Sequence, residues 1–246
     1  MIKTQEIPYQ DDETLCHGFM AYDDQWHTPR PAVLLAHDWH GRGLQICNIA
    51  KYMAKLGFVG FALDMYGQAQ LGFDTAARQA LIRPFKEDRR LLLKRITSAF
   101  QTLQNLNLVN AHLIAAMGFC FGGMCVLDLA RSHAVLQSVI SIHGILTPPP
   151  FNDSLTLNTK ILILHGYQDC LVPPQQVRAF AKEMADKKVD YQIQQFGLAK
   201  HGFSNPLVCD KALDFYYDAG SSRRAWDAAY YFLVSNGFDS NNLSTF

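Results

Sequence analysis

The sequence predicts an α/β fold in which a mostly parallel sheet carries helices on both of its faces. Two observations lead to this prediction. Short continuous apolar runs, typical of strands buried on both faces, recur along the chain. From Ala32 onwards these runs alternate with segments whose apolar residues are spaced as on one face of a helix. We expect a single domain over residues 1–246, because no repeat, low-complexity tract or change of composition divides the chain.

In the first part of the chain, strands are expected at Thr14–Tyr22, Pro31–His37 and Phe58–Leu63. The helix before the third strand should end at Gly57, since glycine favours the residue after a helix. A short helix over Thr75–Ile82 should be interrupted by Pro84, which cannot donate a backbone hydrogen bond. A longer amphipathic helix is expected from about Glu87.

In the second part, strands are expected at Leu113–Met117, Leu136–Ile142, Lys160–Leu164 and Tyr191–Phe196. The segment Met124–Ala130 is apolar on almost all sides, which predicts a buried helix. Residues 148–159 are expected to form a loop rather than a domain linker, because a strand follows directly. Another helix should carry Val177 and Phe180, and a long loop over residues 200–222 should precede a last helix.

Composition and charge exclude several classes of function. The 22 Lys and Arg residues equal the 22 Asp and Glu residues, so the net charge gives no reason to expect a nucleic-acid or membrane partner. The polar residues 1–13 do not form a secretory signal, and no apolar run approaches the length of a membrane span. The six cysteines form no C-x-x-C pair, so we expect free thiols in a reducing compartment and a cytoplasmic protein.

The stretch Gly118-Phe119-Cys120-Phe121-Gly122-Gly123 lies between an expected strand and an expected helix. Glycines two residues before and after Cys120 permit a tight turn that holds the central residue in a strained conformation. The serine version of this pattern is the nucleophile elbow of α/β-hydrolases. The start of the helix would stabilise a thiolate, and the Phe121 N–H would point at an oxyanion. Alternatively, the glycines only permit the strand–helix junction, and Cys120 is a small buried apolar residue.

Two further candidates follow later strands. Asp169 comes after the expected strand Lys160–Leu164, and His201 comes after Tyr191–Phe196. In such folds ligands bind beyond the carboxyl ends of the strands, and the order Cys120, Asp169, His201 is that of the nucleophile, acid and histidine of α/β-hydrolases. His201 would act as base toward Cys120, and Asp169 would orient the imidazole. Taken singly, Asp169 could be a capping or turn residue and His201 a turn residue.

From about Thr14 to Leu233 the sequence resembles the dienelactone hydrolase family of α/β-hydrolases. The resemblance rests on the elbow stretch and on four further motifs: Ala36-His37-Asp38-Trp39, Asp64-Met65-Tyr66-Gly67, His165-Gly166-Tyr167-Gln168-Asp169-Cys170-Leu171-Val172-Pro173 and His201-Gly202-Phe203. It implies the α/β-hydrolase fold and a Cys-Asp-His triad. The triad positions of the family fall on Cys120, Asp169 and His201.

The expected substrate-binding residues are Asp38, Tyr66, Gln68, Phe203 and Asn205. Family members that open dienelactone hold its carboxylate with two arginines, and Gln68 and Asn205 stand in those two places. Because an amide cannot form a charged bidentate clamp, we expect a substrate that is neutral at that end and is not dienelactone. Asp38 stands where the family has a glutamate that interacts with the resting thiol. The second oxyanion N–H is expected from Trp39.

We therefore expect a hydrolase of small esters or lactones that forms a thioester on Cys120, as a monomer or small homo-oligomer. Thiolates attack esters and lactones well, whereas a thiolate leaves an amide's tetrahedral intermediate before nitrogen does. His37 and His40 form an H-x-x-H pair, but the pair lies in a loop without a third ligand, so no metal or other cofactor is expected. The alternatives are a carboxylesterase with no lactone preference and a non-hydrolytic protein of the same fold in which Cys120 is an oxidisable sensor or ligand-binding thiol.

Overall fold

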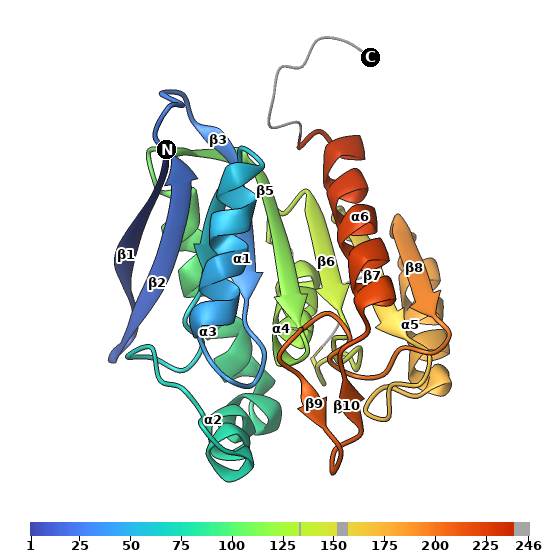
Figure 1. The fold of residues 1–246 in the computed structure, drawn as a ribbon. Coiled ribbons are helices and arrows are strands. Elements are labelled where there is room, and N and C mark those ends of the chain that lie inside the picture. Colours follow the sequence, from blue (N-terminus) through green and yellow to red (C-terminus); the bar gives the residue numbers. More distant parts are fainter. Residues whose placement is uncertain (133, 152–156, 239–246) are drawn as a thin grey trace.

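A computed structural model describes residues 1–132, 134–151 and 157–238 of the chain. One eight-stranded sheet runs through it in the order β1-β2-β4-β3-β5-β6-β7-β8 (Figure 1). Its strands are β1 (Ile2–Asp11), β2 (Thr14–Asp23), β3 (Arg30–Ala36), β4 (Val59–Ala62), β5 (Val109–Phe119), β6 (Ser138–Ile142), β7 (Lys160–Gly166) and β8 (Tyr191–Phe196). All neighbours from β4 to β8 pair in parallel, and only β1 with β2 and β2 with β4 are antiparallel. The predicted mostly parallel sheet is confirmed.

Helices cover both faces of the sheet, as predicted. They are α1 (Leu44–Lys55), α2 (Thr75–Glu87), α3 (Arg89–Gln104), α4 (Phe121–Arg131), α5 (Pro174–Asp186) and α6 (Ala219–Ser235). Figure 1 shows α1 and α6 in front of the sheet and α3, α4 and α5 behind it. Successive residues of β3 serve opposite faces: Leu34 belongs to the buried cluster with α3, α4 and α5, and Leu35 to the cluster with α1 and α6.

Strand β1 was not expected, because most of its residues are polar. It is an edge strand that pairs with β2 along its whole length, from Ile2 opposite Asp23 to Asp11 opposite Thr14. Its carboxyl half alternates, with Ile7, Tyr9 and Asp11 buried and the residues between them exposed. The sequence of β1 contains too few apolar residues to distinguish this strand from a polar tail.

The expected interruption of a helix at Pro84 was wrong. Helix α2 is not interrupted at Pro84 but continues to Glu87, because a proline in the last turn removes only one backbone donor and its own carbonyl still accepts from the Asp88 N–H at 2.9 Å. The loop expected over residues 148–159 is confirmed where the structure describes it, since residues 148–151 and 157–159 contain no helix or strand; residues 152–156 lie outside the described part of the chain.

The expected long loop over residues 200–222 was also wrong. It contains a small two-stranded sheet of β9 (Cys209–Asp210) and β10 (Phe215–Tyr216), and α6 begins inside the range. Two-residue strands are too short to leave a periodic pattern in the sequence. This β9–β10 hairpin lies beyond the carboxyl ends of the central strands (Figure 1).

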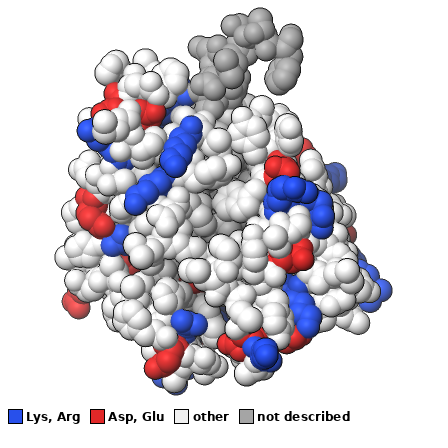
Figure 2. Space-filling view, in the orientation of Figure 1, with Lys and Arg blue, Asp and Glu red and all other residues white. Residues whose placement is uncertain are grey.

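Figure 2 shows acidic and basic side chains interspersed on the face seen in Figure 1, without a large area of one sign. Within the part of the chain that the structure describes, no helix combines the length and the apolar character needed to cross a membrane.

Candidate active site

Cys120 occupies the turn between β5 and α4. Its backbone has φ 53° and ψ −114°, a conformation that L-residues adopt only at an energetic cost. A Cβ atom at Gly118 would lie 2.0 Å from the Gly122 carbonyl oxygen, and one at Gly122 would lie 2.1 Å from the carbonyl oxygen of Ala36. The two glycines therefore permit the close approach of β3, β5 and α4 that fixes this turn.

The structure brings the side chains of Cys120, Asp169 and His201 together. His201 Nε2 lies 3.0 Å from Cys120 Sγ, and His201 Nδ1 lies 2.8 Å from Asp169 Oδ2. The second carboxylate oxygen of Asp169 accepts from the backbone N–H of Leu171 at 2.9 Å. His201 and Asp169 are buried, while Cys120 is partly exposed to solvent. Among these three hydrogen-bonded side chains, Cys120 is therefore the one that a ligand can reach.

The electrostatics of this group favour a protonated His201. Burial disfavours the imidazolium, but the negative charge of Cys120 and the hydrogen bonds to Asp169 and Cys120 outweigh it and raise the pKa of His201 to about 10. In the protonated ring the Nδ1–H donates to the carboxylate and the Nε2–H donates to the sulfur. This arrangement is chemically suited to a thiolate–imidazolium pair.

Two aromatic side chains that the sequence reasoning missed enclose the His201 ring. The ring of Phe215, on β10, lies 4.6 Å from it, and the ring of His143 lies 5.1 Å from it. Burial holds the pKa of His143 well below its usual value, so this histidine stays neutral beside the imidazolium. The position of His143 directly after the expected strand Leu136–Ile142 was a usable signal. The place of Phe215 was not readable from the sequence, because it depends on the β9–β10 hairpin.

Backbone donors are available near the sulfur. In the described part of the chain, the N–H groups of Phe121 and Trp39 donate to no protein acceptor. The side chains of both residues line the same cavity as Cys120. The Trp39 carbonyl accepts a hydrogen bond from the Tyr66 hydroxyl at 3.0 Å, and the Asp38 carboxylate accepts from the His40 N–H at 2.8 Å. Hydrogen bonds at Asp38 and at Trp39 therefore hold the loop after β3 in place.

A cavity of about 210 Å³ adjoins Cys120. It is lined by Trp39, Gln79, Ile82, Lys86, Cys120, Phe121, Met124, Ile145, Leu171, Leu213 and Phe215. Most of these side chains are apolar, and the one with a fixed charge, Lys86, is exposed. The cavity therefore suits a small, largely apolar ligand.

The five residues expected to bind substrate do not line this cavity. Asn205 is buried and its amide donates to Gln45 on α1 at 2.9 Å, while Gln68 is exposed and lies in a turn with φ 54°. Phe203 is fully buried in the apolar cluster between the sheet and helices α1 and α6. The Tyr66 ring is buried as well, between His37 at 4.8 Å and Phe121 at 6.0 Å.

The fifth residue, Asp38, uses its carboxylate within its own loop. Beside it, both ring nitrogens of His37 are engaged: Nδ1 lies 2.6 Å from the Asp38 carbonyl oxygen, and Nε2 accepts from the Met65 N–H at 3.2 Å. His37 therefore offers no free lone pair to a metal, and the described residues contain no group of three or more His, Cys, Asp or Glu side chains placed to hold one.

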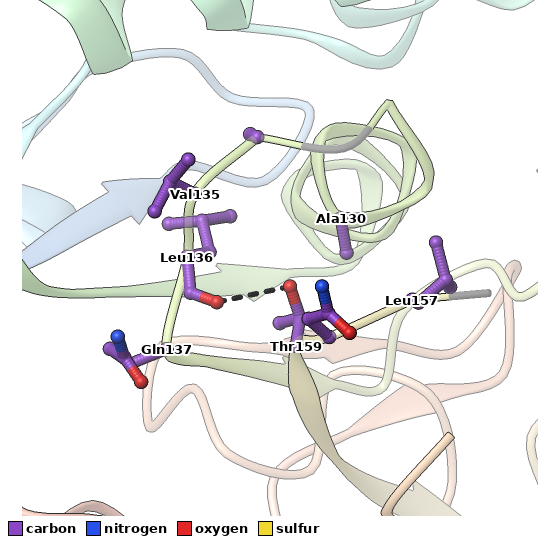
Figure 3. Close-up of a pocket in the computed structure, with 8 residues that line it drawn as sticks. Ala130, Val135, Leu136, Gln137, Leu157 and Thr159 are labelled. Carbon is purple, nitrogen blue, oxygen red and sulfur yellow. Dashed lines mark hydrogen bonds between the residues drawn. The ribbon is translucent and has the colours of Figure 1, made fainter. Parts of the chain in front are cut away.

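A second cavity, of about 230 Å³, lies where β6 and β7 begin (Figure 3). Figure 3 shows the hydrogen bond of 3.1 Å from the Thr159 hydroxyl to the Leu136 carbonyl at its wall. Cys120 lies at the other end of β6, where its N–H donates to the Ile142 carbonyl. This cavity is therefore separate from the candidate site.

The sequence pattern of the dienelactone hydrolase family matches residues 17–236. The chain belongs to this family. A probable 2-oxo-3-(5-oxofuran-2-ylidene)propanoate lactonase from Bradyrhizobium is 28% identical over 182 residues, which are 70% of this chain and 73% of that protein. A putative carboxymethylenebutenolidase from Aquifex aeolicus is 26% identical over 93% of this chain and 97% of that protein.

Solved structures of dienelactone hydrolases and related enzymes share the fold. A dienelactone hydrolase-like promiscuous phosphotriesterase from metagenomic libraries is 32% identical, with a TM-score of 0.91 over 95% of this chain and 98% of that one. An α/β hydrolase from a deep-sea metagenome library, 18% identical, matches with a TM-score of 0.68 over 95% and 98% of the two chains. The predicted α/β-hydrolase fold is confirmed.

Proposed function

We propose that this member of the dienelactone hydrolase family hydrolyses small esters or lactones, with Cys120 as nucleophile, His201 as acid and base, and Asp169 as the group that orients His201. The observation that carries the proposal is the pair of contacts made by His201, 3.0 Å to the sulfur and 2.8 Å to the carboxylate. A nucleophile, a base and an orienting acid in hydrogen-bond contact are the arrangement that covalent acyl transfer needs.

In the first step the Cys120 thiolate attacks the carbonyl carbon, so that a C–S bond forms and the carbonyl electrons move onto oxygen. The N–H groups of Phe121 and Trp39 stabilise this oxyanion. When the intermediate collapses, the C–O bond to the alcohol breaks and the leaving oxygen takes the proton from His201 Nε2. The products of the step are a thioester on Cys120 and a neutral imidazole.

Acylation itself prepares His201 for the second step. The charge of Cys120 is the largest of the influences that raise the pKa of His201, and a thioester no longer carries that charge. The imidazole then accepts a proton from water at Nε2 while the water oxygen bonds to the acyl carbon. The C–S bond breaks, the acid departs, and the thiolate–imidazolium pair is restored.

The size and the lining of the cavity support a small substrate. They also support a site in which no bidentate clamp holds an anionic group. Its 210 Å³ equals the liquid volume of about seven water molecules at about 30 Å³ each. Gln68 and Asn205, at the family's two arginine places, do not line the cavity, so we propose that dienelactone is not the preferred substrate.

The test is pre-steady-state hydrolysis of an excess of a nitrophenyl ester by wild type and Cys120→Ser, each with and without iodoacetamide. We expect a burst of nitrophenol equal to the enzyme concentration that alkylation abolishes. A screen of lactones and open esters on the wild type then separates a lactonase from a general carboxylesterase. The absence of a burst, with fast and selective alkylation of Cys120, would overturn the hydrolase and favour a thiol sensor.

A second candidate activity is hydrolysis of neutral phosphotriesters. The observation that favours it is the similarity to the promiscuous phosphotriesterase, at 32% identity over nearly the whole of both chains. Attack of the Cys120 thiolate on phosphorus would expel the alcohol and leave a phosphorylated cysteine. Water would then attack phosphorus, break the S–P bond and restore Cys120. Mass spectrometry after reaction with a nitrophenyl phosphotriester would detect the adduct, and the absence of both the adduct and released nitrophenol would exclude the activity.

A further inference from the structure

The β9–β10 hairpin is bonded to the elements that carry the acid and the base. The Tyr216 N–H donates to the His201 carbonyl at 3.1 Å. The Cys170 thiol, next to the acid Asp169 in the chain, donates to the Leu213 carbonyl at 3.5 Å. The hairpin therefore keeps a fixed position relative to the acid and the base.

Phe215 spans the site from the base to the loop after β3. Its ring lies 4.6 Å from the ring of His201 and 6.3 Å from the ring of Trp39. Only 8% of Phe215 is exposed, and it lines the cavity next to Cys120 together with Leu213 from the same hairpin. No step of the proposed chemistry uses these two side chains, so their position in the cavity needs another explanation.

The chemistry of acylation indicates that the alcohol portion of the substrate lies against Phe215 and Leu213. The leaving oxygen must lie within hydrogen-bond reach of His201 Nε2 to receive its proton, while the oxyanion faces Phe121 and Trp39. Of the two rings that pack on His201, Phe215 lines the cavity, so the carbon chain on the leaving oxygen then passes beside Phe215. The remaining apolar wall, formed by Ile82, Met124 and Ile145, comes from α2, α4 and the segment after β6.

We propose that Phe215, Leu213 and Leu171 form a subsite for the alcohol portion of the substrate and that Phe215 determines its size. This inference rests on the proposed function. All three side chains are apolar, so the subsite selects an uncharged alcohol without strong hydrogen-bonding groups. Leu171 lines the same cavity, and its backbone N–H donates to Asp169.

Phe215→Ala removes a phenyl ring from the wall and so admits a larger alcohol. One methylene in an apolar pocket changes discrimination by about tenfold or more. We therefore expect the ratio of kcat/KM for a bulky alcohol to that for a compact one to rise at least about tenfold. A general loss of activity from a loosened His201 would affect all esters alike and would cancel in this ratio.

The experiment uses two series of esters. Methyl, butyl and benzyl acetates vary the alcohol, and methyl acetate, butanoate and phenylacetate vary the acyl group. Phe215→Ala should change the ranking in the alcohol series and leave that in the acyl series unaltered, and Met124→Ala, on the other wall, should do the reverse. If Phe215→Ala does not fold, Phe215→Leu makes a smaller change in the same direction.

Rates of the separate steps add a readout that a structural role would not move. Every acetate forms the same acetyl-enzyme, so the selectivity must appear in acylation, and the deacylation rate of Phe215→Ala must not depend on the alcohol. An unchanged ranking in the alcohol series, or an equal change in both series, would overturn the assignment. A wild-type enzyme that shows no burst with any ester would instead overturn the proposed function.

Discussion

Removal of the Tyr66 hydroxyl tests whether the loop after β3 supplies an oxyanion donor. The hydroxyl donates to the Trp39 carbonyl at 3.0 Å. Burial raises the pKa of Tyr66 well above its usual value, so the hydroxyl keeps its proton and remains a donor over the pH range of the assay. The Tyr66 ring packs between His37 and Phe121, and Tyr66→Phe keeps that packing. The substitution therefore frees the Trp39 backbone while it leaves the surrounding structure in place.

The structure bounds the size of the effect. A single hydrogen bond contributes about 0.5–1.5 kcal/mol net, which corresponds to a factor of about 2 to 13. Complete loss of one oxyanion donor would cost about 2.7–4 kcal/mol, or about 10²- to 10³-fold in kcat. Because Tyr66→Phe loosens Trp39 without removing its N–H, we expect kcat to fall about tenfold, within the range for one hydrogen bond and below that for the loss of a whole donor.

The assay compares ester hydrolysis with alkylation of Cys120 by iodoacetamide. Alkylation needs the thiolate but forms no oxyanion, so its rate should be unchanged while kcat falls. Tyr9→Phe is the matched control, because the Tyr9 hydroxyl is also buried and bonds the backbone of Asp64 at 2.8 and 3.0 Å instead of Trp39. Equal kcat in Tyr66→Phe and wild type, or an equal fall in the alkylation rate, would refute the role of Trp39.

Three further predictions concern the elbow and the His201 environment. In Cys120→Ser the pKa of His201 should fall below its value of about 10, since the largest influence that raises it is lost, and an NMR titration of the imidazole nitrogens should show this fall; an unchanged titration would contradict it. Acylation needs the protonated ring, so wild-type activity should decline as the pH rises through about 10. Asp169→Asn should move that decline to lower pH, and a pH–rate profile that stays in place would contradict it. In Gly122→Ala the new Cβ would meet the Ala36 carbonyl oxygen at 2.1 Å, so we expect a loss of about 1–3 kcal/mol in the free energy of unfolding and a melting temperature lower by several degrees; an unchanged melting curve would exclude the clash.

The central strands and the places of Cys120, Asp169 and His201 could be predicted because the physics that sets them is local. A strand buried on both faces leaves a continuous apolar run, and a turn as tight as that at Cys120 requires glycines on both sides. In a parallel sheet the residues after successive strands meet at one edge. Side chains 81 positions apart, such as Cys120 and His201, are therefore brought together by topology alone.

Most residues that line the cavity could not be predicted in the same way, because a pocket is formed by side-chain directions and by short elements without periodicity. Leu213 and Phe215 line the cavity only because the two-residue strands β9 and β10 turn the chain back over His201. Tyr66 was expected in the pocket for its aromatic ring, but only its hydroxyl reaches the site, through the Trp39 carbonyl.

Asn205 was expected to bind substrate from its place in a motif, and in the structure its side chain is engaged within the protein. It follows His201 by four residues, and its amide donates to Gln45 on α1 while its backbone N–H donates to Gly202. A buried amide that is fully engaged in this way cannot turn toward a ligand without leaving Gln45 unpaired, which costs about 1–3 kcal/mol. Asn205 therefore joins the loop that carries His201 to α1. Under the proposed function, substrate selection then falls to residues that line the cavity, such as Phe215.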